Sequence, residues 1–156
     1  MKASRLLSIL MLLQSRGRLT AAELARAMEV STRTILRDID QLSAAGVPLW
    51  THANGDAAID MVIRAHERAG VRQGDDRRHV VVHSQFVRPD QLDAYQRFGL
   101  AASFFSNHAF YWGDVHLRNL GPERADQLSP MRSAHARGIR YSNHSDYSVT
   151  PLDPAM

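Results

Sequence analysis

The 156-residue chain contains no cysteine. This absence excludes disulfide bonds, thiolate zinc sites and cysteine nucleophiles, so histidine and carboxylate side chains are the strong metal ligands that remain. Lysine is almost absent too, because Lys2 is the only one and arginine supplies the other basic side chains. Eight histidines are present, so a metal site of nitrogen and oxygen ligands stays possible.

Long hydrophobic runs are also missing. The apolar run from Leu6 to Leu13 is too short to cross a bilayer, and Ser8 interrupts it. Arg16 and Arg18 follow without a small-residue cleavage site, which argues against a signal peptide. We therefore expect no membrane segment and a cytoplasmic location.

Positive charge is concentrated near the amino terminus. Residues 1–50 carry seven basic and four acidic residues, a net charge of +3, whereas the other 12 arginines are balanced by 12 acidic residues. A polyanion is therefore expected to bind the first third of the chain.

The amino-terminal segment reads as short helices with clear start signals. Apolar residues at helical spacing predict a first helix over residues 4–15. Thr20 and Glu23 form a capping box that opens a second helix over about 21–28. Ser31 caps a third helix whose inward face carries Ile35, Ile39 and Leu42. Two capped helices on either side of a tight turn predict a DNA-reading helix-turn-helix.

The third helix, over residues 31–45, would carry the DNA contacts. Arginine forks reach guanine edges or phosphates, and hydroxyl groups bind phosphate. A plain solvated helix face is the alternative, and Asp38 and Asp40 count against DNA binding. The candidate DNA-binding residues are Ser31, Thr32, Arg33, Thr34 and Arg37.

Residues 4–49 resemble the winged helix-turn-helix heads of DeoR-like and WYL-domain bacterial transcription regulators. The matching stretches are SRLLSILMLLQSRGRLTAAELA and VSTRTILRDIDQLSAAGVP. The resemblance implies that the five residues above lie at recognition-helix positions and contact double-stranded DNA. Such heads continue from GVP into a glycine-rich turn and a wing strand, but THANGDAAID follows here.

The remainder of the chain suggests alternating strands and helices. Asn54-Gly55 is typical of a type I′ turn, so residues 47–60 could form a replacement wing, but a helix over 57–69 fits the apolar spacing better. Alternation of strands and helices predicts parallel strands covered by helices. Strands are expected at 79–83, 100–105 and 139–142, and helices at 89–98, 131–137 and from Gly121-Pro122 to about Ser129-Pro130.

Polar clusters follow the strand-like runs at 51–56, 83–85 and 143–146. Side chains at the carboxyl ends of barrel strands converge on one mouth, so His52, His83 and Asp146 could bind one divalent ion. Nitrogen and carboxylate ligands suit zinc. The alternative is that some of the eight histidines lie near strand ends by chance.

From about Trp50 onward the chain resembles the carboxyl-terminal part of amidohydrolase family 3, which includes N-substituted formamide deformylases. The resemblance rests on HANGDAAID, HSQ, ASFFSNHAFYWGD, LGPERADQLSPMRSA and HSDYSVTPLDP. It implies a TIM-like barrel that hydrolyses carbon-nitrogen bonds. It also implies that His52 and His83 ligate metal, and that Asp146 is the catalytic carboxylate that ligates metal and activates water. His108, Tyr111 and Trp112 would lie in a substrate-facing loop, with packing as the alternative for His108 and Trp112.

Two features of the family are missing from this segment. It contains no H-x-H pair and no lysine to serve as a carboxylated bridging ligand. At most four barrel strands are expected, which predicts open sheet edges and self-association through the tail.

The sequence thus predicts an α+β chimera. Residues 1–50 form a three-helix helix-turn-helix domain with an incomplete wing, and residues 51–156 form a truncated TIM-like β/α segment. The predicted function is a DNA-binding, transcription-regulator-like protein with an inactive tail. The alternative is a metal-dependent amidohydrolase acting on non-peptide carbon-nitrogen bonds, and a third reading is a fusion without a selected function.

Overall fold

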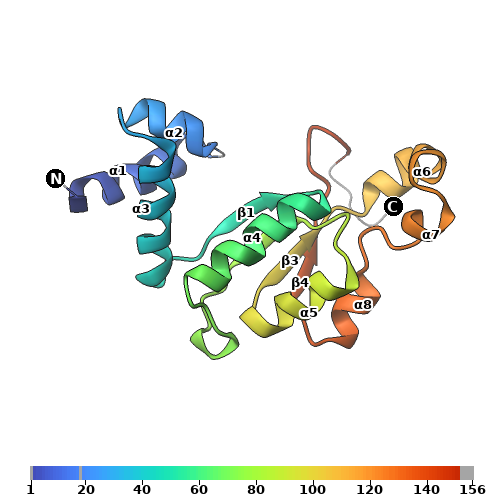
Figure 1. Ribbon diagram of the computed structural model, residues 1–156. Helices are drawn as coiled ribbons and strands as arrows, with labels where there is room; N and C mark the ends of the chain where they lie inside the picture. Colours follow the sequence, from blue (N-terminus) through green and yellow to red (C-terminus); the bar gives the residue numbers. More distant parts are fainter. Residues whose placement is uncertain (1, 18, 152–156) are drawn as a thin grey trace. The chain divides into compact units, whose positions relative to one another are not determined.

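The computed structural model describes residues 2–17 and 19–151 (Figure 1). Contacts divide the chain into two compact units, Met1–Val47 and Pro48–Met156, called unit 1 and unit 2 below. None of the helices in the described part of the chain is long and apolar enough to span a membrane.

Unit 1 contains helices α1 (Lys2–Arg16), α2 (Ala21–Ala27) and α3 (Thr32–Ala44), close to the predicted ranges. The predicted capping box is present, because Thr20 Oγ1 accepts from the Glu23 backbone N–H while Glu23 accepts from the Thr20 N–H. Ser31 Oγ accepts from the Thr34 N–H and caps α3 in the same way. The small aliphatic core comprises Ile9, Leu24, Ala25, Ile35 and Leu42.

Unit 2 is built on a parallel sheet with strand order β1-β2-β3-β4. The strands are β1 (Trp50–Ala53), β2 (Val80–His83), β3 (Ala101–Phe104) and β4 (Tyr141–Asn143). Each strand is thus followed along the chain by the strand beside it. The prediction of parallel strands separated by helices is confirmed.

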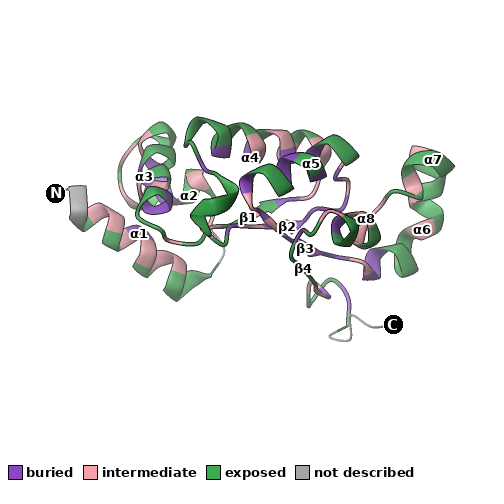
Figure 2. Ribbon diagram, turned by 90° about the horizontal axis from the view of Figure 1, so that it is seen from below, coloured by how far each residue is buried: buried purple, intermediate pink, exposed green. Residues whose placement is uncertain are grey.

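Helices α4 (Asp56–Arg68), α5 (Pro89–Phe98) and α8 (Met131–Ala136) pack on one face of this sheet, as Figures 1 and 2 show. The core between them joins strand residues Ala53, Val81, Ala102 and Phe104 to Ile59, Leu92, Tyr95 and Ala134 of the helices. The shorter or peripheral elements are η1 (Gln73–Asp75), α6 (Asn107–Leu120) and α7 (Pro122–Ala125).

The structure decides between the two readings of the segment after Pro48. Helix α4 begins at Asp56, and β1 pairs in parallel with β2, so residues 47–60 do not form a hairpin wing. The favoured helix is confirmed. One detail was wrong, because His52 lies inside β1 and not in a loop beyond it.

Three elements differ clearly from the sequence prediction. The last strand starts at Tyr141 and not at Ile139, since the Ile139 N–H bonds back to the Ala134 carbonyl and its side chain fills the core. The helix that opens at Pro122 ends already at Ala125. Residues 107–120 form helix α6, with a kink at Trp112 (φ −134°), where the sequence prediction had a loop.

Candidate functional site

The carboxyl ends of β2 and β4 bring three potential metal ligands together. Among the described residues, one group of His, Asp and Glu side chains could hold a metal ion, namely His83, His144 and Asp146. Their candidate ligand atoms all lie within 4.8 Å of one another. His83 is buried, while His144 and Asp146 are partly accessible. Two imidazoles and one carboxylate form a donor set that suits a divalent ion such as zinc.

A chain of hydrogen bonds orients the His144 ring. Ser142 Oγ donates to Ser103 Oγ (3.0 Å), which leaves the Ser103 hydroxyl hydrogen for His144 Nδ1 (3.0 Å). His144 Nε2 then lies 3.1 Å from His83 Nδ1. In this arrangement His144 Nε2 carries the proton and His83 Nδ1 accepts it. A cation bound between the two rings would replace that shared proton.

Aromatic neighbours fix the same rings. The His144 ring stacks on Phe105, with centroids 5.6 Å apart and planes 18° apart. The His52 ring packs edge-on against His83 at 4.5 Å between centroids. His52 is therefore next to the cluster, although the three close ligand atoms come from His83, His144 and Asp146.

The backbone is unusual at this edge of the sheet. His83, Ser84 and Asp146 have φ values of 74°, 47° and 48°, in the left-handed region that costs free energy for residues other than glycine. Packing keeps the first two in place, because the buried Ser84 Oγ donates to the Val81 carbonyl and contacts the Tyr95 hydroxyl (3.0 Å). Strain of this kind is typical of positions that orient functional side chains.

Behind the cluster lies a second, buried histidine network. The Gln85 side-chain amide donates to His108 Nδ1 (3.0 Å) and lies 3.3 Å from His116 Nε2. On the other side of the ring, His108 Nε2 is 3.4 Å from Ser129 Oγ. Burial, followed by the neighbouring His116, lowers the pKa of His108 to about 4. His108 is therefore neutral at pH 7. Its burial and its contacts with Gln85 and Ser129 favour the packing alternative, while a role toward a substrate stays a prediction.

The other two predicted substrate residues are more accessible. Tyr111 and Trp112 lie on α6, with 39% and 38% of their surface exposed. The prediction that they belong to a loop was wrong, because the segment lacks the Gly and Pro residues that interrupt a helix, apart from Gly113 at the kink. Their role toward a substrate stays a prediction.

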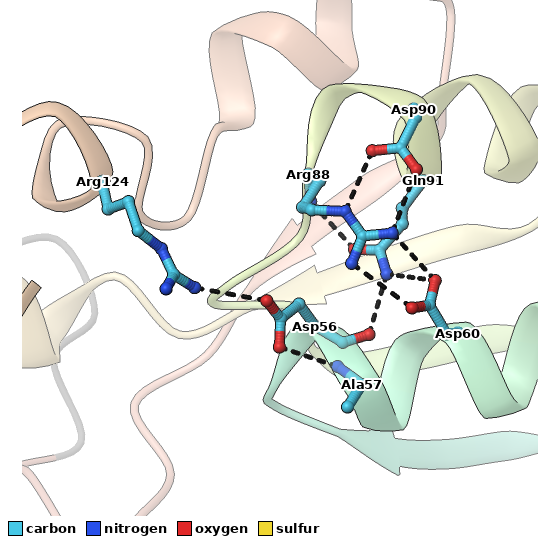
Figure 3. Close-up of polar contacts among 7 residues, drawn as sticks. All are labelled: Asp56, Ala57, Asp60, Arg88, Asp90, Gln91 and Arg124. Atoms are coloured by element: carbon cyan, nitrogen blue, oxygen red, sulfur yellow. Dashed lines mark hydrogen bonds and ion pairs between the residues drawn. The ribbon is translucent and has the colours of Figure 1, made fainter.

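A polar network anchors the starts of α4 and α5 beside this edge (Figure 3). Arg88 contacts Asp60 through two nitrogens (3.0 and 3.3 Å) and also binds Asp90. The buried Gln91 donates to the Asp56 carbonyl and to Asp60. Hydrogen bonds from Arg88 and Gln91 lower the pKa of Asp60, so the carboxylate stays charged.

A pocket of about 230 Å³ lies at this network, where Asp56, Phe86, Arg88 and Arg124 are among the lining residues. Arg124 reaches Asp56 across it (3.2 Å, Figure 3). The ligand cluster does not line this pocket.

In unit 1, the predicted DNA-binding residues lie at the N-cap and in the first two turns of α3. Ser31, Thr32, Arg33 and Arg37 are exposed and Thr34 is half-buried. The hydroxyls of Ser31 and Thr34 are 2.9 Å apart and take part in the cap. The two arginines are therefore the long side chains that this surface offers to a ligand.

Asp38, by contrast, does not belong to that surface. It is fully buried and forms an ion pair with Arg5 of α1, whose Nη2 lies 2.9 Å from Asp38 Oδ1. The sequence argument that Asp38 opposes DNA binding was wrong, because the Asp38 carboxylate is buried in unit 1 and paired with the Arg5 guanidinium. Asp40 remains exposed.

Comparison with known proteins identifies the family to which the chain belongs. The sequence profile of the amidohydrolase family matches residues 8–156. The chain belongs to this family. The fold is similar to those of two crystal structures of uncharacterized metal-dependent hydrolases, from Pyrococcus furiosus (TM-score 0.62, 23% identity) and Pyrococcus horikoshii OT3 (TM-score 0.60, 21% identity). They align with 76% and 78% of this amidohydrolase-family chain and with 24% of each solved chain, and establish similarity of fold.

Two of the similar curated proteins are described as HTH-type transcriptional regulators. The uncharacterized HTH-type transcriptional regulator YobV of Bacillus subtilis is 44% identical over 62 residues, 40% of this chain and 20% of its own length. The HTH-type transcriptional repressor CsqR of Escherichia coli is 35% identical over 72 residues, 46% of this chain and 28% of its own. The protein LONG AFTER FAR-RED 3 of Arabidopsis thaliana is 29% identical over 112 residues, 70% of this chain and 19% of its own.

The chain thus spans 19% to 28% of the length of these curated relatives. The prediction that a regulator-like part and an amidohydrolase-like part occur in one chain is confirmed.

Proposed function

We propose that the protein is a DNA-binding, transcription-regulator-like protein in which α3 of unit 1 enters the major groove as the recognition helix of a helix-turn-helix. The observation that carries this proposal is the exposed start of α3, where Arg33 and Arg37 stand one turn apart. Side chains at the amino-terminal end of a recognition helix are the ones that contact base edges.

The charge arrangement of unit 1 supports the same proposal. Asp38 lies on α3 but is withdrawn into the ion pair with Arg5. Its negative charge is therefore kept away from a phosphate backbone, while the arginines remain available. The regulator relatives support the proposal independently, because both are described as HTH-type.

Duplex binding is tested by fluorescence anisotropy with a DNA fragment selected for binding to the purified chain. Binding is expected to weaken with rising salt, since each neutralised phosphate releases a counterion. Arg33→Ala is expected to cost about 1 to 3 kcal/mol if its fork contacts a base. Arg132→Ala, which removes an exposed arginine from α8 of unit 2, is the matched control and should leave affinity unchanged. Equal affinity of the wild type and the Arg33→Ala/Arg37→Ala variant would contradict the proposal.

A second candidate function rests on the ligand cluster. We infer that His83, His144 and Asp146 hold one divalent ion, with His52 as a neighbouring nitrogen donor. A zinc ion bound there would polarise a carbonyl oxygen and lower the pKa of a bound water. The Ser103–His144 hydrogen bond would orient the ring, as outer-shell partners of metal ligands do. Asp146 is the candidate for handling the proton of that water.

Zinc binding is tested by calorimetric titration of the chelator-treated protein. His144→Ala is expected to weaken zinc binding by at least about tenfold, because loss of even an outer-shell partner has an effect of that size. His135→Ala, at an exposed position of α8, is the control and should leave zinc affinity unchanged.

The zinc-loaded chain should also be assayed against formamide and N-acyl substrates. We expect no turnover, since the segment lacks the H-x-H pair and the lysine of related sites. Turnover that disappears in Asp146→Asn would make hydrolysis the primary function.

A further inference from the structure

Two imidazole rings of α6 face one side-chain amide in the interior of unit 2. The rings belong to His108 and His116, and their centroids are 5.0 Å apart. The amide nitrogen of Gln85 lies 3.0 Å from His108 Nδ1 and 3.3 Å from His116 Nε2. Gln85 and His108 are buried, and His116 is half-buried. The three side chains therefore meet at one enclosed polar point.

The hydrogen-bond partners fix the position of the proton on the His108 ring. Ser129 Oγ donates its hydrogen to the Phe105 carbonyl oxygen at 3.1 Å, so it can only accept from His108 Nε2. His108 therefore carries its proton on Nε2 and presents a lone pair on Nδ1. Burial lowers the pKa of His108, which leaves the ring without a second proton at pH 7. Metal-ligating histidines show the same arrangement, in which one ring nitrogen donates to an oxygen and the other is the ligand.

A break in α6 allows the two rings to share this point. His108 and His116 are eight positions apart, which in an uninterrupted helix corresponds to about 12 Å along the axis. Trp112, midway between them, has a non-helical φ of −134°. Aromatic contacts hold both rings, since His108 packs edge-on against Phe105 (5.3 Å between centroids) and His116 against Phe86 (6.0 Å). The pair is thus a product of the fold and not of regular helical spacing.

We propose that His108 Nδ1 and His116 Nε2 bind one divalent transition-metal ion, zinc or copper, at a site separate from the ligand cluster at the ends of β2 and β4. Imidazole nitrogen is a ligand that suits both ions. The NH2 group of Gln85 lies between the two nitrogens, and its partial positive charge is the kind of partner that their lone pairs require. Neither DNA binding nor the ligand cluster is needed for this site.

Gln85 can supply a third ligand without movement of the backbone. The Ser129 N–H donates to the Gln85 carbonyl oxygen at 2.9 Å and holds the main chain at this position. Rotation of the side-chain amide about its terminal bond exchanges the NH2 group for Oε1, and this torsion is only weakly restricted. The amide oxygen would then face the ion together with the two nitrogens, and a water would complete a tetrahedral set.

Calorimetric zinc titration gives the first test, in a background variant that disables the ligand cluster. His144→Ala/Asp146→Asn is this background, and it is expected to bind one zinc ion per chain. Adding His116→Ala is expected to weaken that binding by at least about tenfold, since loss of even an outer-shell partner has an effect of this size. His135→Ala, at an exposed position of α8, is the matched control and should leave the binding unchanged. No zinc bound by the background, or binding unaffected by His116→Ala, would overturn the proposal.

Gln85→Glu in the same background should change zinc affinity in the opposite direction. The substitution places a carboxylate beside the two nitrogens, and its attraction to the cation is expected to tighten zinc binding by about tenfold or more. An ion bound elsewhere on the chain would not respond to this change. Unchanged affinity in Gln85→Glu would therefore contradict the site.

Electron paramagnetic resonance of the Cu²⁺-loaded background then identifies the ligands. Hyperfine splitting from two imidazole nitrogens is expected, and splitting from one nitrogen is expected after His116→Ala. This readout reports the ligand atoms directly and does not depend on the affinity of the site. A two-nitrogen signal that persists in His116→Ala would assign the ion to other histidines and refute the proposed site.

Discussion

The core of unit 1 consists of aliphatic side chains, whereas that of unit 2 encloses aromatic rings and is bordered by many buried polar groups. In unit 1 the buried polar residues are Asp38 and Ser43 among the described positions. Unit 2 buries histidines, serines and glutamines along one edge of its sheet, His83, His108 and Gln85 among them. Burying a polar group is unfavourable unless it is hydrogen-bonded, so unit 2 has to satisfy many more such groups.

The difference separates the two proposed sites. Unit 1 offers Arg33 and Arg37 on an exposed helix face, and its interior serves only to hold that helix. Unit 2 has its candidate ligands at the edge of the core, where the same contacts orient the rings and stabilise the fold. A substitution in unit 1 can therefore separate binding from stability more cleanly than one near His83.

The largest expected effect comes from the cores, and it tests whether the units unfold separately. Phe104→Ala removes a ring that is 0% exposed and is expected to destabilise unit 2 by about 3 to 5 kcal/mol. Both tryptophans lie in unit 2, so their fluorescence reports on that unit, while circular dichroism at the helix band reports on both. Chemical denaturation should show an earlier fluorescence transition and an unchanged helical transition of unit 1.

Ile35→Ala provides the mirror experiment. The side chain is 0% exposed in the core of unit 1, and its truncation is expected to cost about 2 to 5 kcal/mol without moving the fluorescence transition. If either variant shifts both transitions equally, the two units unfold as one and the comparison fails.

How far the sequence predicts the structure differs between the units in the same way. The helices of unit 1 follow from local signals, namely the Thr20/Glu23 box, the Ser31 cap and the apolar spacing, and they are found where predicted. The ion pair of Arg5 with Asp38 was missed, because it joins residues 33 positions apart and no local pattern specifies it.

In unit 2 the sequence identified the strand runs but not the contacts at their ends. His83 and Asp146 were predicted as ligands and lie together, although their metal role stays a prediction. His144 was within a recognised polar cluster but was not chosen, since its contact with His83 exists only because β2, β3 and β4 are adjacent. The sequence signal that could have identified His144 is its position two residues before Asp146, directly after a strand. Helix α6 was missed because its apolar residues are exposed and follow no amphipathic pattern, as with Phe110 and Leu117.

A smaller effect on stability is expected from breaking the ion pair between Arg5 and Asp38 in unit 1. Asp38→Ala leaves Arg5 without its buried partner and should destabilise unit 1, but by less than Ile35→Ala, because Arg5 remains partly in water. Asp40→Ala on the same helix is exposed and should change stability by less than about 0.5 kcal/mol. Equal stability of the two variants would mean that the buried pair contributes nothing to the packing of α1 on α3.

The smallest expected effect is a pH dependence confined to unit 2. Burial, followed by the nearby His66 and Arg77, lowers the pKa of His79 to about 4, and its Nδ1 accepts the Leu49 N–H at 3.0 Å. In the unfolded chain, His79 takes up a proton near its ordinary pKa of 6.5. The stabilisation that neutral His79 contributes to the folded state is therefore fully present above pH 6.5 and is lost as pH falls toward 4. Between pH 7.5 and pH 5, unit 2 should lose on the order of 1 to 2 kcal/mol through this group, with the buried His108 adding a loss in the same direction.

His79→Asn tests the assignment, since an amide oxygen can accept the Leu49 N–H without titrating. Denaturation followed by tryptophan fluorescence at the two pH values should give a smaller loss in this variant than in the wild type. The hydrogen-bonded carboxylates Asp60 and Asp90 do not interfere, because their pKa values are lowered from 3.8 and they titrate below this window. Unit 1 contains no histidine, so its helical transition should move little over the same range. If unit 1 instead loses as much stability as unit 2, the acid sensitivity does not come from buried histidines and the contrast between the two cores has another cause.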